Sequence, residues 1–258
     1  SLKLQELALN RGRPEEAATI ARRRAANFET RPRDDLYAVI DALIWQADSG
    51  LADQAARRAT GTVTAAARLP ADPRDDFYFH YCASHLWAGM RRPGEAAERV
   101  TALRRVPDPM VHTQSIYLRF CADVLDAEHA VATGRPDATR AIERLDSLSR
   151  TAPPTLTWVL ALGNLTAARL WETTGDPRRA LEAVRRRLYI TDYGEPRALV
   201  AHATFLREEG RLAALLGDTT TATRAWRKFM ALRAQAEPSL QPEVAQVRAR
   251  LQALGGER

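Results

Sequence analysis

Two patterns in the sequence could bind a metal ion. Asp75-Asp76 matches the first part of a DDxxD helix motif, whose carboxylates hold divalent cations. The fifth position of the motif is Phe79 instead of Asp, however, and the same Asp pair occurs earlier as Asp34-Asp35. Asp126 and His129 could supply ligands from one helix, although no second group of His or Cys residues completes a site. We therefore interpret the Asp pairs as helix caps and Asp126 with His129 as a solvated helix face, and we expect no metal or other cofactor.

A catalytic nucleophile is not indicated by the sequence. Cys82 and His85 could hydrogen-bond on one helix, but nucleophilic catalysis also requires an orienting third group and an oxyanion donor, and neither can be identified. The sequence contains no GxSxG, Walker A or GxGxxG motif. Two cysteines, Cys82 and Cys121, cannot form a disulfide framework, so we interpret them as small buried hydrophobic residues in a reducing compartment. We expect a protein without enzymatic activity.

Arginine is the charged side chain that dominates the composition. Of 38 basic residues, all but Lys3 and Lys228 are Arg, against 32 acidic residues and a net charge of +6. The positive charge lies at the two ends, because residues 1–33 carry 8 basic and 4 acidic groups and residues 177–258 carry 15 and 9. Basic ends can bind nucleic acid, but these arginines alternate with Glu and Ala at helical spacing, which favours solvated helix faces.

The elements that must position these side chains are helices. The 258 residues include 47 Ala and 30 Leu, which favour helix, and 45% hydrophobic residues, which suffice for a core. No stretch of 18 apolar residues could span a membrane, and the chain begins at Ser1 without a signal peptide. We expect a fragment of a longer chain, cytoplasmic unless the parent is a membrane-anchored receptor, in which case it is extracytoplasmic.

Internal repeats organise the whole chain. The segment at 32–37 (Pro-Arg-Asp-Asp-Leu-Tyr) recurs at 73–78 with Phe for Leu, an offset of 41 residues. A Gly is followed five residues later by Ala at Gly12, Gly50, Gly175 and Gly217, and more loosely at Gly89 and Gly134. Each period predicts two helices, the first ending at the Gly and the second carrying small residues where the helices cross. The approximate repeats are 1–33, 34–74, 75–111, 112–154, 155–195 and 196–241. They are followed by residues 242–258, in which we expect a capping helix from Pro242 to Leu254.

The last two periods carry the most specific marks. Gly210, Gly217, Ala222 and Trp226 match the pattern of the tetratricopeptide repeat (TPR) family, with Phe229 where Ala is usual, and the period of Trp171 and Gly175 matches nearly as well. The chain thus resembles this family over its whole length, although its periods exceed the family's 34 residues. The resemblance implies an all-α, right-handed superhelix of about six helical hairpins in a single domain, residues 1–258. The closing stretch also resembles TPR regions of large bacterial regulators and receptor-type Ser/Thr kinases.

The resemblance further implies that the first helices line a concave groove. The groove positions run from apolar residues near the N-terminus to basic residues near the C-terminus. Our hypothesis is that three arginines clamp an acidic or C-terminal carboxylate group of a partner peptide while apolar residues receive its hydrophobic side chains. Alternatively, Glu172 and Glu208 neutralise the arginines within the fold. The predicted groove residues are Tyr37, Ile40, Ile44, Phe79, Glu128, Arg169, Arg207 and Arg211.

The sequence therefore predicts a non-catalytic protein–protein interaction module, the sensor or scaffold part of a larger bacterial protein. One alternative is self-association, with the groove or an uncapped end filled by a second copy. Another is a helical repeat that binds nucleic acid through its basic ends. The periods with aromatic marks are acidic, which disfavours the stacking of bases between aromatic and basic side chains.

Overall fold

The computed structural model describes residues 2–27, 81–82, 85–86, 88–90, 92–105, 112–152, 156–186 and 198–255. Regular structure in these ranges is helical and includes no β-strand, which confirms the all-α prediction. The α-helices are α1 (Leu2–Asn10), α2 (Pro14–Asn27), α6 (Ala96–Arg105), α7 (His112–Ala132), α8 (Ala138–Thr151), α9 (Thr157–Thr173), α10 (Pro177–Arg185), α11 (Ala198–Leu215), α12 (Thr219–Leu232) and α13 (Gln241–Ala253). Two short 3-10 helices, η1 (Pro93–Glu95) and η2 (Pro238–Leu240), precede α6 and α13.

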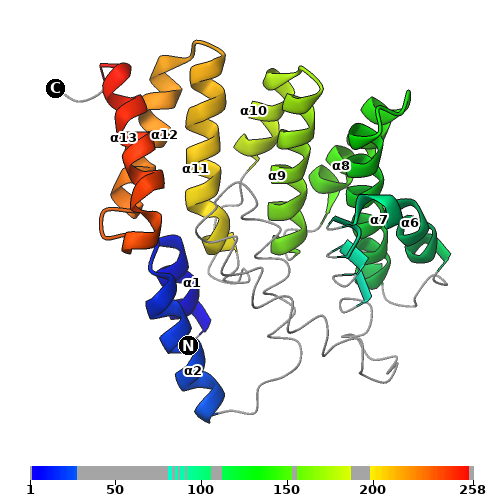
Figure 1. The fold of residues 1–258 in the computed structure, drawn as a ribbon, viewed down its shortest axis with the longest axis horizontal. Helices are drawn as coiled ribbons and strands as arrows, with labels where there is room; N and C mark the ends of the chain where they lie inside the picture. Colours follow the sequence, from blue (N-terminus) through cyan, green and yellow to red (C-terminus); the bar gives the residue numbers. More distant parts are fainter. Residues whose placement is uncertain are drawn as a thin grey trace.

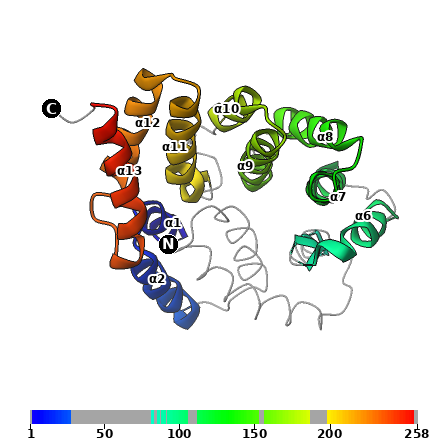
Figure 2. The same cartoon turned by 45° about the horizontal axis from the view of Figure 1, so that its top comes forward.

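Successive helices pack side by side in two layers (Figure 1). Helices α7, α9 and α11 follow the inner side of an arc, and α8, α10 and α12 follow its outer side (Figure 2). Each outer helix contacts the inner helix before it, and α8 and α10 also contact the inner helix that follows. This is the repeat-like helical packing that the sequence predicts.

Glycines make the turns within the hairpins. Gly12, Gly134, Gly175 and Gly217 have φ angles of 73°, 63°, 87° and 78°, a left-handed conformation that costs free energy for residues with a Cβ. All four were predicted as helix ends. Gly89 differs, because it lies within helical residues 88–90, where an added Cβ would stand 2.6 Å from a Cδ atom of Leu125.

The helix starts follow from local sequence. Pro14 and Pro177 occupy the first residue of α2 and α10, where a missing N–H costs no hydrogen bond. The carboxylates of Asp176 and Asp218 each accept a backbone N–H three residues further on, at 3.0 Å. Helix α13 agrees with the predicted final helix to within one residue. The predicted Asp caps near residues 34 and 75 lie outside the described residues.

Small residues allow the two helices of a hairpin to approach closely. Ala180 and Ala222 are buried, as predicted for the crossing points. The indole of Trp226 lies against Gly210, where an added Cβ would stand 2.3 Å from the ring, and its Nε1 donates to the carbonyl of Arg207 at 3.2 Å. This contact joins α12 to α11 and explains the Gly and Trp of the last period.

The N-terminal hairpin α1–α2 packs against the C-terminal helices. Helix α1 contacts α11, and both figures show the hairpin beside α11 and α13 (Figures 1 and 2). The carbonyl of Gly12 accepts the N–H of Glu237 at 2.8 Å, and Oδ1 of Asn10 accepts the N–H of Ala203 at 3.1 Å. In a simple open array each hairpin would contact only its sequence neighbours, so the two ends of this chain meet in a way that the repeat pattern did not predict.

Charges at the helix ends stabilise this docking. The carboxylate of Glu237 accepts the N–H groups of Glu15 and Glu16 at the start of α2, with distances of 2.9–3.2 Å. The buried guanidinium of Arg233 donates to the carbonyl of Leu9 in the last turn of α1 at 3.0 Å. An anion thus lies at a helix N-terminus and a cation at a helix C-terminus, the favourable arrangement at both.

The cysteines correct one prediction. Both are fully buried, as expected, but Cys82 and Cys121 form a disulfide with Cα atoms 5.7 Å apart. The two cysteines are 39 positions apart in the sequence, close to one period, so their sulfur atoms occupy equivalent positions in neighbouring repeats. The number of cysteines could not predict this disulfide, because Cys82 and Cys121 become adjacent only when the repeats stack.

Candidate functional site

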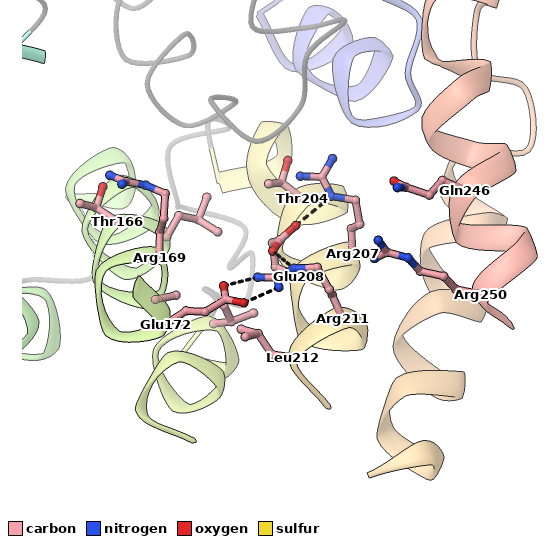
Figure 3. A pocket seen from close by; sticks show the side chains of 13 residues that line it. Thr166, Arg169, Glu172, Thr204, Arg207, Glu208, Arg211, Leu212, Gln246 and Arg250 are labelled. Carbon is pink, nitrogen blue, oxygen red and sulfur yellow. Dashed lines mark hydrogen bonds and ion pairs between the residues drawn. The ribbon is translucent and has the colours of Figure 1, made fainter. Parts of the chain in front are cut away.

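A pocket of about 330 Å³ opens between α9, α11 and α13, with one contribution from α10 (Figure 3). Its lining is mixed, with four apolar residues and nine polar or charged ones. The apolar lining comprises Leu165, Ala168, Val184 and Leu212; the polar and charged lining comprises Thr166, Arg169, Glu172, Thr204, Arg207, Glu208, Arg211, Gln246 and Arg250.

The three predicted arginines lie in this one pocket. Arg169 comes from α9, and Arg207 and Arg211 come from α11, one turn apart. Glu128 of α7 lies outside the lining but pairs with Arg169, 41 residues away. The other predicted groove residues, Tyr37, Ile40, Ile44 and Phe79, lie outside the described residues.

Glutamates hold the arginine side chains. Arg211 binds Glu172 through two parallel hydrogen bonds of 2.5 and 2.6 Å, and its Nε donates to Glu208 at 2.7 Å (Figure 3). Arg207, with 8% of its side chain exposed, pairs with Glu208 at 3.0 Å and with Glu243 of α13 at 2.6 Å. The alternative in which Glu172 and Glu208 pair with the arginines within the fold is therefore present in the structure.

The pKa values of the paired groups shift accordingly. The hydrogen bonds from Arg211 lower the pKa of the Glu172 carboxyl, and this outweighs the opposing effect of burial. The same hydrogen bonds raise the pKa of Arg211 above its ordinary value. Arg211 and Glu172 therefore remain ionised at neutral pH and join α9 to α11 on the inner side of the arc.

Among the polar lining residues that the sequence did not predict are Thr204, Gln246 and Arg250. Thr204 is 1% exposed, and its Oγ1 has no hydrogen-bond partner among the described residues. Gln246 and Arg250 lie four residues apart on one face of α13 and reach toward α11 (Figure 3). The sequence predicts only a capping role for this helix, although a polar pair at this spacing on a terminal helix can indicate a functional face.

Asp126, which the sequence suggested as a possible metal ligand together with His129, has another role in the structure. Asp126 is buried rather than solvated, with 6% exposure, and it accepts hydrogen bonds from Arg104, Arg135 and Arg144 at 3.2, 2.8 and 2.6 Å. Burial opposes ionisation, but these arginines outweigh it and lower the pKa of Asp126. Asp126 thereby links α6, α7 and α8. Within the described ranges, no group of three or more His, Cys, Asp or Glu side chains could hold a metal ion.

None of the described helices has the length and apolar character needed to cross a lipid bilayer.

Comparisons with known proteins supply no further identification: no family model, no curated protein and no solved structure matches this chain.

Proposed function

We propose that the chain is a TPR-like right-handed α-solenoid that serves as a non-catalytic protein-interaction module. The two-layer packing and the turn glycines at 134, 175 and 217, which are 41 and 42 residues apart, support this proposal. The close contact between Gly210 and Trp226 also supports it, because these residues carry the strongest resemblance to the family. In the parent protein, a larger bacterial chain, the module acts as a sensor or scaffold.

The observation that carries the binding role is the arginine-lined pocket between α9, α11 and α13. Its lining combines four guanidinium groups and two carboxylates with four apolar side chains, and two of its helices, α9 and α11, belong to the inner layer. An apolar surface with a few polar groups at defined positions is typical of binding sites. The ligand that fits best is an acidic segment of a partner protein, with an apolar side chain against the apolar lining residues and an acidic group among the arginines.

Binding assays with two peptide pools test this proposal. Fluorescence polarisation would compare fluorescein-labelled pools of equal length, one rich in Asp and Glu with apolar residues and one in which Lys replaces the acids. We expect saturable binding of the acidic pool only. Arg169→Ala should weaken this binding by about 3- to 10-fold, since the interaction involves a partly exposed charge. Arg178→Ala, on an exposed face of α10 outside the pocket, is the matched control.

Four outcomes would contradict the proposal. Equal binding of both pools, or binding insensitive to Arg169→Ala, would show that the pocket does not select acidic partners. A mass in light scattering that rises with concentration, without peptide binding, would favour self-association. Tight, salt-dependent binding to generic DNA or RNA would favour a nucleic-acid-binding role for the basic ends.

A further inference from the structure

The pocket contains one buried hydroxyl group, that of Thr204, for which the described residues supply no hydrogen-bond partner. Helical threonines elsewhere in the chain, such as Thr19, Thr101 and Thr173, donate their hydroxyl to the carbonyl four residues earlier, at 2.9–3.0 Å. Thr204 makes no such bond, although it is 1% exposed and lines the pocket. A buried polar group without a hydrogen bond costs free energy in the empty protein, and a ligand atom can remove this cost.

Two side chains of α13 line the same pocket as Thr204. Gln246 and Arg250 extend from α13 toward α11, the helix that carries Thr204 and Arg207 (Figure 3). Arg207 is already held by Glu208 and Glu243. No described residue forms an ion pair with Arg250, whose guanidinium therefore keeps its hydrogen-bond donors for a ligand. Guanidinium, amide and hydroxyl groups together make a site for an oxygen acceptor.

The charges around the pocket select the kind of acceptor. Each of the other three arginines already pairs with at least one glutamate, so Arg250 is the lining cation for which the described residues supply no counter-charge. One cation matches one carboxylate, whose two oxygens fit the planar guanidinium. A phosphate dianion would need a second cation, and binding it would require breaking an existing ion pair. The charged residues counted are Arg169, Arg207, Arg211 and Arg250, with Glu128, Glu172, Glu208 and Glu243.

We propose that Thr204, Gln246 and Arg250 form a subsite that binds a single carboxylate group of the partner. Arg250 forms the ion pair, and the Gln246 amide and the Thr204 hydroxyl donate hydrogen bonds to the carboxylate. This inference rests on the proposed function and deepens it, because it assigns carboxylate recognition to two residues of α13 and to Thr204 of α11 instead of the three predicted arginines. The carboxylate belongs either to an Asp or Glu side chain or to a peptide C-terminus.

The test measures the binding of three peptides, each synthesised as a variant of one sequence selected from the acidic pool. One has an amidated C-terminus and one Glu, one has a free C-terminus and no acidic side chain, and one has phosphoserine in place of the Glu. Arg250→Ala should weaken the carboxylate peptides by about 10- to 100-fold, and Arg248→Ala, on the exposed face of the same helix, by less than 2-fold. The amidated and free-terminus peptides distinguish the two sources of the carboxylate.

Thr204→Val separates recognition from structural support. Because Val keeps the shape of Thr and removes an unpaired buried hydroxyl, we expect the free protein to unfold at an equal or higher temperature while peptide affinity falls about 5- to 10-fold. Acidic peptides that bind with Arg169 dependence but unchanged affinity in Arg250→Ala and Thr204→Val would overturn the subsite and leave the proposed function standing. Stronger binding of phosphoserine than Glu would also overturn it. No binding of any acidic peptide would contradict both proposals.

Discussion

Replacing Gly12 with Ala tests the docking of the N-terminal hairpin. Gly12 has a φ of +73°, and an added Cβ would stand 2.6 Å from Nη1 of Arg233 and 2.9 Å from Cβ of Ala236. Gly134 is a matched control, because it has a φ of +63° in an equivalent hairpin turn but no atom within 4 Å of an added Cβ. The two substitutions share the backbone cost and differ in the steric conflict.

The magnitude follows from these two contributions. A residue with a Cβ in the left-handed region costs about 1–2 kcal/mol, which both variants pay. Overpacking a close contact adds about 1–3 kcal/mol, and at Gly12 it displaces a buried guanidinium that donates to Leu9. We therefore expect Gly134→Ala to lower the free energy of unfolding by about 1–2 kcal/mol, and Gly12→Ala by about 2–5 kcal/mol.

Two measurements check this expectation. Urea denaturation gives the free energy of unfolding of each variant, and amide hydrogen exchange reports the local opening of α1 and α2. Gly12→Ala should increase exchange in α1 and α2 and leave α7 and α8 unchanged, whereas Gly134→Ala should have no effect on α1 and α2. Equal costs for the two substitutions, with no change of exchange in the N-terminal hairpin, would refute the docking of Gly12 against Arg233 and Ala236.

Two further predictions concern links between helices. The disulfide joins residues 39 positions apart, so Cys82→Ala with Cys121→Ala should lower the free energy of unfolding by up to about 4 kcal/mol. Thiol titration of the unreduced, unfolded chain should find no free thiol, and two free thiols would contradict the pairing. Glu172, whose pKa is lowered by Arg211, stabilises the fold above its unfolded-state pKa of about 4.3, and this contribution is lost as pH falls through the lower folded-state pKa. The free energy of unfolding should therefore fall less between about pH 5 and pH 3 in Glu172→Gln than in the unmodified protein, by up to about 1 kcal/mol. Urea denaturation at each pH measures this difference. An equal fall in both proteins would show that the ion pair between Glu172 and Arg211 contributes nothing to stability.

The helical elements could be predicted from the sequence because their causes are local. A Gly that ends a helix needs only its own backbone freedom, as at Gly134 and Gly217, and a Pro at a first helical position needs only its own ring, as at Pro177. The final helix was predicted to within one residue for the same reason. The repeat pattern also brought Arg169, Arg207 and Arg211 to one pocket, because equivalent positions of stacked hairpins share a face.

Contacts between distant residues could not be predicted in the same way. The repeat period makes an ion pair between Glu128 and Arg169 possible, but helix packing selects the partner of each arginine. The pairing of Cys82 with Cys121 depends on the same stacking. The sequence also could not predict that the Thr204 hydroxyl has no hydrogen-bond partner among the described residues. A Thr within a helix can donate to the carbonyl four residues earlier, so its sequence neighbours suggest a satisfied hydroxyl.

The sequence by itself thus determined the helices, their turns and the positions that share a face, since each depends on residues within one or two turns. Tertiary structure decided which charges neutralise one another, which polar groups remain for a ligand, and where the N-terminal hairpin docks. Asn10 and Ala203 are 193 residues apart and meet because the two ends of the chain pack together, a result of the whole packing arrangement that no local pattern contains.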